Sequence, residues 1–322
     1  MNPKVSVITP VYNLQDIVLE TVHSVLRQTF TDLELIVADD GSTDRSAELI
    51  AAIDDPRLKL VRGTHSGLPA VGRNRAFQHA RGEFIAIADA DDIWLPDKLA
   101  RQIEFLEKHP SVGIVHTGYH HLIDGQVVEL PVRQHEPQLM LAAEALPRMI
   151  VNNFVCTPTT VIRRSAIERA GFLCDSDPLL CGPEDFDLWL RLCERGVEFG
   201  YIHEPLVLYR IRGTSVSRNL TRNWRGNLRA FEKARQRAPE LYEKHEKLVR
   251  HRLASIYRNL GRMKLIEGEP GGLGDAWHAV TLAPMSLKAW GWTLLGLGGS
   301  RFVRSIMTLR GESASTVSQQ PV

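Results

Sequence analysis

Residues 85–94 have the sequence IAIADADDIW, an apolar run that ends in three carboxylates. The apolar half has the character of a buried strand. Because strand side chains alternate in direction, we expect Asp89 and Asp91 to leave the strand on the same side. Two carboxylates held that close raise each other's pKa unless a cation lies between them. Oxygen ligands at a strand end suit Mg²⁺ or Mn²⁺, and the alternative is a polar turn in which Asp92 caps the next helix.

Around this stretch, strand-like and helix-like segments alternate. Such alternation predicts an α/β fold with a mostly parallel, Rossmann-like sheet, right-handed crossovers and helices on both faces. The predicted strands cover residues 5–9, 33–38, 58–61 and 83–88. The predicted helices cover residues 17–28, 42–53, 70–80 and 96–108.

After about residue 112 the pattern changes and favours a small antiparallel part, with a hairpin turn at Asp124-Gly125. Two more strands are predicted at residues 197–203 and 206–212. From residue 219 the pattern is helical, and residues 273–282 and 286–297 are expected to form a helical hairpin. We therefore predict three parts: a domain over residues 1–218, a helical region over 219–311 and a disordered tail over 312–322.

The composition is that of an ordinary globular protein of 322 residues, with 43% hydrophobic and 24% charged residues. The formal net charge of +1 gives no reason to expect a nucleic-acid partner. The four cysteines show no Cys-x-x-Cys spacing, so we expect free thiols rather than a zinc site. No signal-peptide pattern and no apolar run of about 18 residues are present. We expect a cytoplasmic protein, with a peripheral position at the inner face of the membrane left open.

Polar or small residues follow each of the four predicted parallel strands. In such a sheet, ligands bind outside the carboxyl ends of the strands, so these residues are expected to converge on one ligand. The loop after the third strand has the sequence GTHSG at residues 63–67, which includes His65. The residues to which we assign donor or metal binding are Pro10, Tyr12, Asn13, Asp39, Asp40, Arg73, Asp89, Ala90 and Asp91. Arg75, close to Arg73, is expected to be a solvated helix residue. The chain has neither a G-x-G-x-x-G after the first strand nor a P-loop, which argues against a dinucleotide dehydrogenase and a P-loop NTPase.

These side chains suit a nucleoside diphosphate. Asp39 can accept a hydrogen bond from the imide of a uracil, and Tyr12 offers a flat face to a base or ribose, although plain core packing is the alternative for it. Arg73 can reach the base or a phosphate. Asp89 can take a ribose hydroxyl, and Asp91 can hold the metal that bridges the two phosphates.

Four segments, in this order and at these spacings, resemble the family 2 glycosyltransferases of GT-A fold. They are VSVITPVYN at residues 5–13, VADDGSTD at 37–44, GRN at 72–74, and IADADD at 87–92 with PDKL at 96–99. The resemblance covers about residues 4–215. It implies an inverting enzyme that uses a nucleotide-diphospho-sugar and Mn²⁺ or Mg²⁺. By resemblance, Asp39 binds the base, Asp89 the ribose or the metal, and Asp91 the metal.

The same family has a later Glu-Asp pair that opens a helix, and its Asp is the catalytic base. Residues 183–191, PEDFDLWLR, fit this pattern and assign the pair to Glu184 and Asp185. A helix N-terminus stabilises carboxylates, so a purely structural role is the alternative for Asp185. Asp187 and Trp189 are expected to be structural or to line the acceptor site.

One departure from the family concerns the last strand, after which the family often has Tyr-Arg-x-His. Here residues 209–212 are YRIR, so Arg212 takes the place of a histidine that can help to hold the metal. A guanidinium cannot ligate a metal, but it can pair with phosphate. We predict that Arg212 or Arg210 contacts the diphosphate.

The C-terminal helical region is basic, with 13 lysines and arginines against 4 acidic residues over residues 221–264. Four of them recur at every fourth position and are expected to form one solvated stripe: Arg225, Arg229, Lys233 and Arg237. Contact with anionic lipid headgroups is the alternative. Apolar residues between 290 and 302 fit an interfacial helix, or a cap packed on the first domain or on a second subunit. We favour packing.

The leading hypothesis is therefore a metal-dependent inverting glycosyltransferase. It would move a sugar from a nucleotide diphosphate, with a UDP-sugar favoured, to a hydroxyl of a saccharide or lipid-linked saccharide in cell-surface polysaccharide synthesis. The alternatives are a sugar-phosphate nucleotidyltransferase and a non-catalytic nucleotide-sugar binding module. The sugar, the acceptor, the choice of metal and the oligomeric state are not specified by the sequence.

Overall fold

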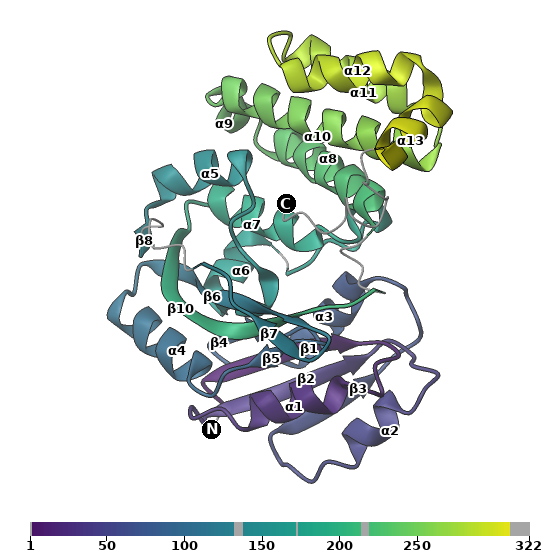
Figure 1. Cartoon of the computed structure of the whole chain (residues 1–322). Coiled ribbons are helices and arrows are strands. Elements are labelled where there is room, and N and C mark those ends of the chain that lie inside the picture. Colours follow the sequence, from purple (N-terminus) through teal and green to yellow (C-terminus); the bar gives the residue numbers. More distant parts are fainter. Residues whose placement is uncertain (1, 132–137, 172, 214–218, 310–322) are drawn as a thin grey trace. The chain divides into compact units, whose positions relative to one another are not determined.

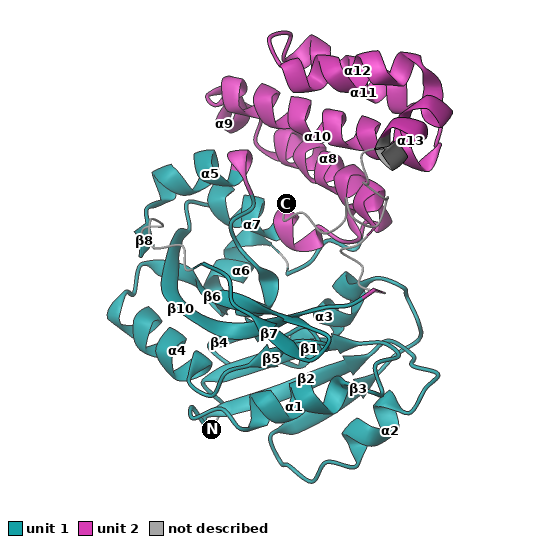
Figure 2. Ribbon diagram, viewed as in Figure 1, with its two compact units in different colours: residues 1–149, 153–176, 188–212 teal, residues 150–152, 177–187, 213–322 magenta. Residues whose placement is uncertain are grey.

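The computed structural model describes residues 2–131, 138–171, 173–213 and 219–309 (Figure 1), and the predicted tail lies outside them. The chain divides into two compact units (Figure 2). Unit 1 comprises residues 1–149, 153–176 and 188–212, and unit 2 comprises residues 150–152, 177–187 and 213–322.

The described strands form one mixed sheet in unit 1, with the order β3-β2-β1-β4-β9-β6-β10-β5, to which β7 and β8 add at β6 and β10. The strands are β1 (Val5–Val11), β2 (Leu33–Asp39), β3 (Leu58–Arg62), β4 (Phe84–Ile87), β5 (Ile93–Trp94), β6 (Val112–Ile123), β7 (Gln126–Val128), β8 (Leu139–Met140), β9 (Val161–Arg163) and β10 (Glu198–Ile211). The first four pair in parallel, as predicted.

The order of these four strands reverses at β1. The chain passes from β1 through β2 to β3 on one side, and then returns to place β4 on the other side of β1. The connecting helices are α1 (Val18–Leu26), α2 (Ser46–Ala51) and α3 (Pro69–His79). Because crossovers are right-handed, the reversal places α3 on the face opposite α1 and α2. It also creates a switch point between β1 and β4, and open sheets bind ligands outside the carboxyl ends of strands at such a point.

The apolar runs predict the parallel strands well because these strands lie in the buried core of unit 1. Each residue of β2 and of β4 is buried. Helix α4 (Lys98–Lys108) then packs behind the carboxylate turn through a buried lysine. Lys98 is 0% exposed, its Nζ donates to Gln102 Oε1 at 2.8 Å, and it lies 3.7 Å from the centroid of the Trp94 ring. Burial lowers the pKa of Lys98 well below that of a solvated lysine. The lysine of the PDKL segment is thus a packing residue that ties α4 to β5.

The later strands differ in one respect from the prediction. Residues 197–203 and 206–212 are not two strands but one long strand, β10, which runs parallel to β6. Its register shifts on either side of Pro205, because proline has no N–H to donate to the ladder. The predicted hairpin is confirmed: β6 and β7 are antiparallel and join at Asp124-Gly125, both of which have positive φ.

The remaining helices outside the C-terminal region are α5 (Ala142–Val151), α6 (Arg164–Ala170) and α7 (Glu184–Glu194), with short 3₁₀ turns η1 (Thr157–Thr159) and η2 (Pro178–Leu180). The C-terminal helices are α8 (Leu220–Arg237), α9 (Pro239–Glu243), α10 (Glu246–Glu267), α11 (Gly272–Leu282), α12 (Leu287–Leu297) and α13 (Gly299–Leu309). The predicted helical hairpin is confirmed as α11 and α12. Within the described residues, no helix combines the length and apolar character needed to cross a membrane.

Close contact between α10 and α11 depends on Gly261. A Cβ at this position would lie 2.7 Å from the backbone of Ala276 and Gly272. The absence of a side chain therefore allows α11 to lie directly on α10 (Figure 1). The result is a layered helical unit with its own apolar clusters.

Candidate active site

The ends of β1 and β2 form the first wall of the candidate site. Asp39 is the last residue of β2 and lies beside Val11 of β1 in the parallel register. Its carboxylate is 3% exposed and accepts from the Ser42 backbone N–H at 3.2 Å. Tyr12 follows β1, is 39% exposed, and stacks on His65 with ring centroids 3.9 Å apart. Tyr12 is therefore not a core residue, and the pair presents a flat aromatic surface next to Asp39's strand.

The sequence places His65 after the third predicted strand but assigns it no role in the site. It lies in the loop after β3, and only its position at the end of a parallel strand could have indicated it. Asp40 holds this loop: its carboxylate accepts from the Ser66 N–H at 2.9 Å and the Gly67 N–H at 3.1 Å. Asp40 is 6% exposed. Its predicted role in donor binding stays a prediction, while the structure gives it a role in shaping the loop.

Asn13 and Arg75 also shape these loops. Asn13 has a φ of 50°, and its side-chain oxygen accepts from the Thr43 N–H at 2.8 Å, which fixes the loop after β2. The expectation that Arg75 is solvated is wrong. Its guanidinium donates to the carbonyl oxygens of Asp39 and Thr64, at 3.3 and 3.4 Å, because two strand-end loops expose their carbonyls toward it.

Helix α3 brings Arg73 to the fourth strand end. Arg73 is 6% exposed, and its Nη2 lies 2.7 Å from Asp89 Oδ1. Gly72 permits this approach, because a Cβ there would lie 2.8 Å from the Pro10 ring. The ends of β1, β3 and β4 are thereby joined through α3. Asn74, on the same helix, bonds both backbone groups of Cys174, at 2.7 and 3.0 Å, and so anchors α3 to the segment before residue 177.

The carboxylates of residues 89–92 lie in a turn rather than on a strand. β4 ends at Ile87, and the Asp92 N–H donates to the Asp89 carbonyl at 3.1 Å, which closes the turn. Strand alternation therefore does not apply to Asp89 and Asp91, and that reason for placing them on one side is wrong. Ala90, between them, is buried. Burial, and then the charge of Asp89, raise the pKa of Asp91 to about 6.

Asp92 faces inward and fixes the end of β10. It is 1% exposed, and its Oδ1 accepts from the Arg210 N–H at 2.8 Å. The Arg210 guanidinium donates to the Asp91 carbonyl at 2.7 Å and pairs with Glu20 of α1 at 2.6 Å. Arg210 thus braces the carboxylate turn. The next arginine, Arg212, points its Nη1 to within 3.7 Å of Asp91 Oδ2.

These groups fit a divalent cation that also binds substrate oxygens. The negative charge of Asp89 disfavours the ionised form of Asp91, and a cation between the two carboxylates would remove that penalty. No group of three or more His, Cys, Asp or Glu residues is placed to hold a metal ion anywhere in the described part of the chain. Within the described residues, this turn therefore offers a cation two neighbouring carboxylates, those of Asp89 and Asp91, and a bound substrate or water would have to supply the remaining ligands.

Glu184 and Asp185 open helix α7, as predicted, and they belong to unit 2. Glu184 is buried, and its Oε2 accepts from the Gly182 N–H at 2.7 Å. Asp185 Oδ1 accepts from the Phe186 N–H at 2.6 Å. Asp187 is 0% exposed and pairs with Arg237 at 2.8 Å, so it is structural, as is the fully buried Trp189.

The segment before α7 is held by helix α8, and the expectation of a solvated basic stripe on α8 is wrong. Arg229 and Lys233 both pair with Asp177, at 2.9 and 3.6 Å. Arg225 pairs with Glu269. The stripe faces acidic residues from other parts of unit 2 that are distant in sequence, so a pattern within α8 alone does not reveal its partners. Together with the pair between Arg237 and Asp187, the contacts of Asp177 hold residues 177–187 at both ends.

Gly226 of α8 offers a test of this support. A Cβ there would lie 2.5 Å from the Pro183 ring, directly before Glu184. We expect Gly226→Ala to lower the rate of catalysis by about 10- to 100-fold, because the segment that carries Asp185, the predicted catalytic base, would lose its alignment, while nucleotide binding is unchanged. Gly274→Ala in α11, where no atom lies within 4 Å of the new Cβ, is the matched control. Equal turnover numbers for both variants would contradict the supporting role.

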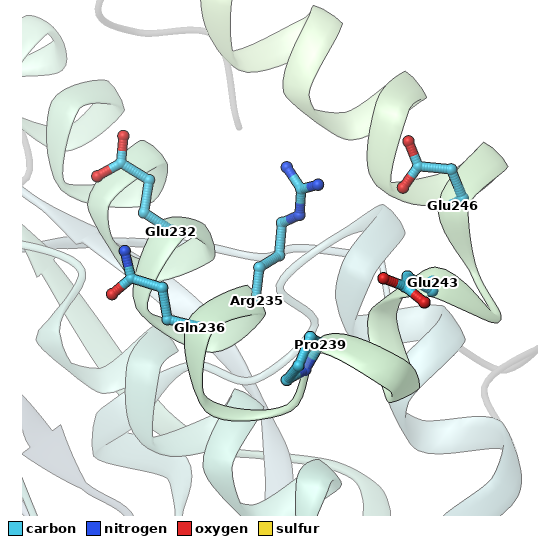
Figure 3. Close-up of a pocket in the computed structure, with 6 residues that line it drawn as sticks. All are labelled: Glu232, Arg235, Gln236, Pro239, Glu243 and Glu246. Carbon is cyan, nitrogen blue, oxygen red and sulfur yellow. The ribbon is translucent and has the colours of Figure 1, made fainter.

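A pocket of about 290 Å³ lies elsewhere in unit 2 (Figure 3). Its lining residues are Glu232, Arg235, Gln236, Pro239, Glu243 and Glu246. Figure 3 shows Arg235 between Glu232 and the two other glutamates. None of the residues predicted for the donor, the metal or the base lines it, so this pocket is not the candidate site.

Comparison with known proteins agrees with the motifs. The family model described as glycosyl transferase family 2 matches residues 6–171. TuaG of Bacillus subtilis, named as a teichuronic acid biosynthesis glycosyltransferase, is 33% identical over 220 residues, which cover 67% of this chain and 82% of TuaG. WfaP of Escherichia coli, a UDP-Glc:alpha-D-GlcNAc-diphosphoundecaprenol beta-1,3-glucosyltransferase, is 30% identical over 215 residues, covering 67% and 80%.

Solved structures share the fold over nearly the whole chain. The mannosyltransferase PcManGT from Pyrobaculum calidifontis, in complex with GDP-Man and Mn²⁺, has a TM-score of 0.61 at 20% identity and covers 97% of this chain and 89% of its own. S. aureus TarS 1–349 in complex with UDP-GlcNAc has a TM-score of 0.58 at 18% identity, covering 96% and 92%. The predicted GT-A-type fold with a C-terminal helical region is confirmed.

Proposed function

This chain belongs to glycosyl transferase family 2 and is a glycosyltransferase. We propose that it transfers a sugar from a UDP-sugar to a hydroxyl of a lipid-linked saccharide. The reaction would use a divalent cation and would invert the anomeric configuration. The observation that supports the donor site is that Asp39 ends β2, and Asp89 and Asp91 follow β4, so that these carboxylates lie on the two strands beside β1 at the switch point of the sheet. Arg73 of α3 pairs with Asp89 at the same edge. This is where an open α/β sheet binds its ligand.

The nucleotide would occupy the ends of β1 and β2. The stacked rings of Tyr12 and His65 offer the base a flat surface. Asp39, almost buried at the end of β2, has acceptor capacity left beside its bond to Ser42 and can take an imide N–H of uracil. Arg73, already near Asp89, can exchange part of that contact for a phosphate oxygen.

The diphosphate would lie over the carboxylate turn. Asp91, with Asp89, would hold Mn²⁺ or Mg²⁺, which neutralises charge that develops on the leaving nucleoside diphosphate. Arg212 provides a second positive group at the same carboxylate. Since Arg210 is already engaged with Asp91 and Glu20, Arg212 is the better candidate for direct phosphate contact.

Asp185 would remove the proton from the acceptor hydroxyl. Direct attack by that oxygen on the anomeric carbon, opposite the leaving diphosphate, inverts the configuration. Glu184 bonds the Gly182 N–H and thereby orders the backbone that carries Asp185. The lipid-linked acceptor is suggested by WfaP and WfgD, both named for a glucosyl transfer to GlcNAc-diphosphoundecaprenol.

A thermal-shift panel tests the donor assignment. UDP, GDP, dTDP and their glucose conjugates are each added with and without Mn²⁺ or Mg²⁺. Ligand at about 100 times its Kd stabilises a protein by about 2.7 kcal/mol, which is a Tm increase of about 5 °C for a chain of this size. We expect the UDP compounds to give a metal-dependent increase. No response to any nucleotide would overturn the proposal, and a response to GDP alone would reassign the base.

A further inference from the structure

Helices α11 and α12 carry an exposed apolar face. It consists of Trp277 of α11, Met285 of the connecting turn, and four residues of α12 at helical spacing. The four are Leu287, Trp290, Leu294 and Leu297. Met285 is 93% exposed, Leu287 86% and Leu297 69%. We call these six residues the α12 face.

The opposite side of α12 is already packed within unit 2. Ala289, Thr293 and Gly296 are buried. A Cβ at Gly296 would lie 3.0 Å from Leu265 Cδ1, so α12 lies close against α10 (Figure 1). The packing that we favoured from the sequence thus uses one side of the helix, within its own unit, and leaves Met285 and the three leucines of the α12 face exposed.

This concentration of apolar surface is unusual for the chain. Of the 15 exposed large hydrophobic side chains in the described residues, seven lie between Trp277 and Phe302. Large contiguous apolar patches mark interaction sites, whereas single exposed residues do not.

The charge of the segment that contains the α12 face indicates the chemistry of its partner. Residues 276–311 contain no Asp or Glu and four Lys or Arg, so this segment is basic, although the formal net charge of the whole chain is only +1. Lys288 and Arg301 are exposed. The two tryptophans meet edge to face, with centroids 5.9 Å apart, and Trp290 Nε1 donates to the Pro284 carbonyl at 2.8 Å. Apolar side chains, rigid tryptophans and basic flanks are the combination that binds at a bilayer interface.

We propose that the α12 face docks this protein onto an anionic lipid bilayer, with the leucines and tryptophans inserted at the headgroup boundary and Lys288 and Arg301 facing lipid phosphates. A second copy of the chain would bury the same apolar residues, but two like basic segments would repel each other across such an interface. The proposal does not depend on the proposed donor or acceptor, because docking needs neither.

Flotation of the full-length protein with vesicles tests the proposal. We expect it to float with vesicles of phosphatidylglycerol and phosphatidylcholine and only weakly with phosphatidylcholine alone. The triple variant Leu287→Gln, Leu294→Gln, Leu297→Gln should bind at least about tenfold more weakly, since each leucine loses its transfer into lipid. Lys288→Gln with Arg301→Gln should weaken binding by about tenfold on the anionic vesicles only.

The matched control makes the same changes on exposed apolar residues of unit 1: Val127→Gln, Val128→Gln and Leu141→Gln. It should float as the unchanged protein does. Melting curves of all variants establish that they are folded. Failure of the unchanged protein to float with anionic vesicles, or wild-type flotation of the leucine variant, would overturn the proposal. A third outcome would also overturn it: the unchanged protein is a dimer, and the leucine variant becomes a monomer that binds vesicles as well as before. A second copy of the chain would then occupy the α12 face.

Discussion

Replacement of Asp185 by Asn is expected to lower the rate of sugar transfer by about 10²–10⁴-fold, the usual contribution of a positioned general base. An amide cannot accept the acceptor's proton at neutral pH. The side-chain oxygen that accepts from the Phe186 N–H at 2.6 Å remains in the variant, so the start of α7 should keep its structure. Binding of the nucleotide sugar should therefore be unchanged.

The experiment compares kcat with the donor affinity for the same variant. Glu194→Gln neutralises a carboxylate at the other end of α7 and serves as the control for a general effect of charge on this helix. We expect it to transfer sugar at nearly the normal rate. If Asp185→Asn retained more than about a tenth of the wild-type kcat, the carboxylate would be a helix-terminal group only and another base would have to be sought.

The strand ends were predictable because they depend on local pattern and on one rule of topology. The apolar runs that give β1, β2 and β4 are buried along almost their whole length. The parallel order then brings Asp39 and Asp89 to the same edge of the sheet without knowledge of any side-chain contact. The sequence motifs and the architecture therefore agree on the edge of the sheet at which we propose the donor site.

The contacts that shape the site were not predictable in the same way. The pattern predicts the end of the strand to within one residue and leaves a polar turn open as an alternative, but it does not show the backbone hydrogen bond that closes the turn at Asp89–Asp92. Arg75 and Arg229 have the spacing of solvated helix residues, yet each binds groups from a distant part of the chain. Such pairings depend on how the loops meet after folding, which helical periodicity does not encode.

His65 shows the same limit for an aromatic residue. A single histidine in a glycine-rich loop indicates no ring partner, and its stacking on Tyr12 follows from the way Asp40 ties that loop down. Residues that set the shape of a donor site can thus be harder to predict from the sequence than residues that carry its charge.

Replacement of Asp91 by Asn is expected to abolish the metal-dependent part of nucleotide-sugar binding. Asp91 and Asp89 are the two protein ligands that we propose, and an amide oxygen is a much weaker ligand than a carboxylate for a hard divalent cation. In thermal-shift measurements, a UDP-sugar with Mn²⁺ should then give no greater increase in Tm than the UDP-sugar alone. The metal-dependent increase of the unchanged protein, about 5 °C at 100 times its Kd, should disappear.

The neighbouring residue supplies the matched control. Asp92→Asn makes the same chemical change one position further along, but Asp92 is 1% exposed and uses its Oδ1 to accept from the Arg210 N–H at 2.8 Å, a bond that an asparagine also makes. We expect this variant to be less stable yet to keep the metal-dependent increase in Tm. Because Asp89 is tied to Arg73 at 2.7 Å, its replacement would disturb the arginine as well, so Asp91 gives the cleaner test. Retention of the full metal effect in Asp91→Asn would mean that the cation is not held by this turn.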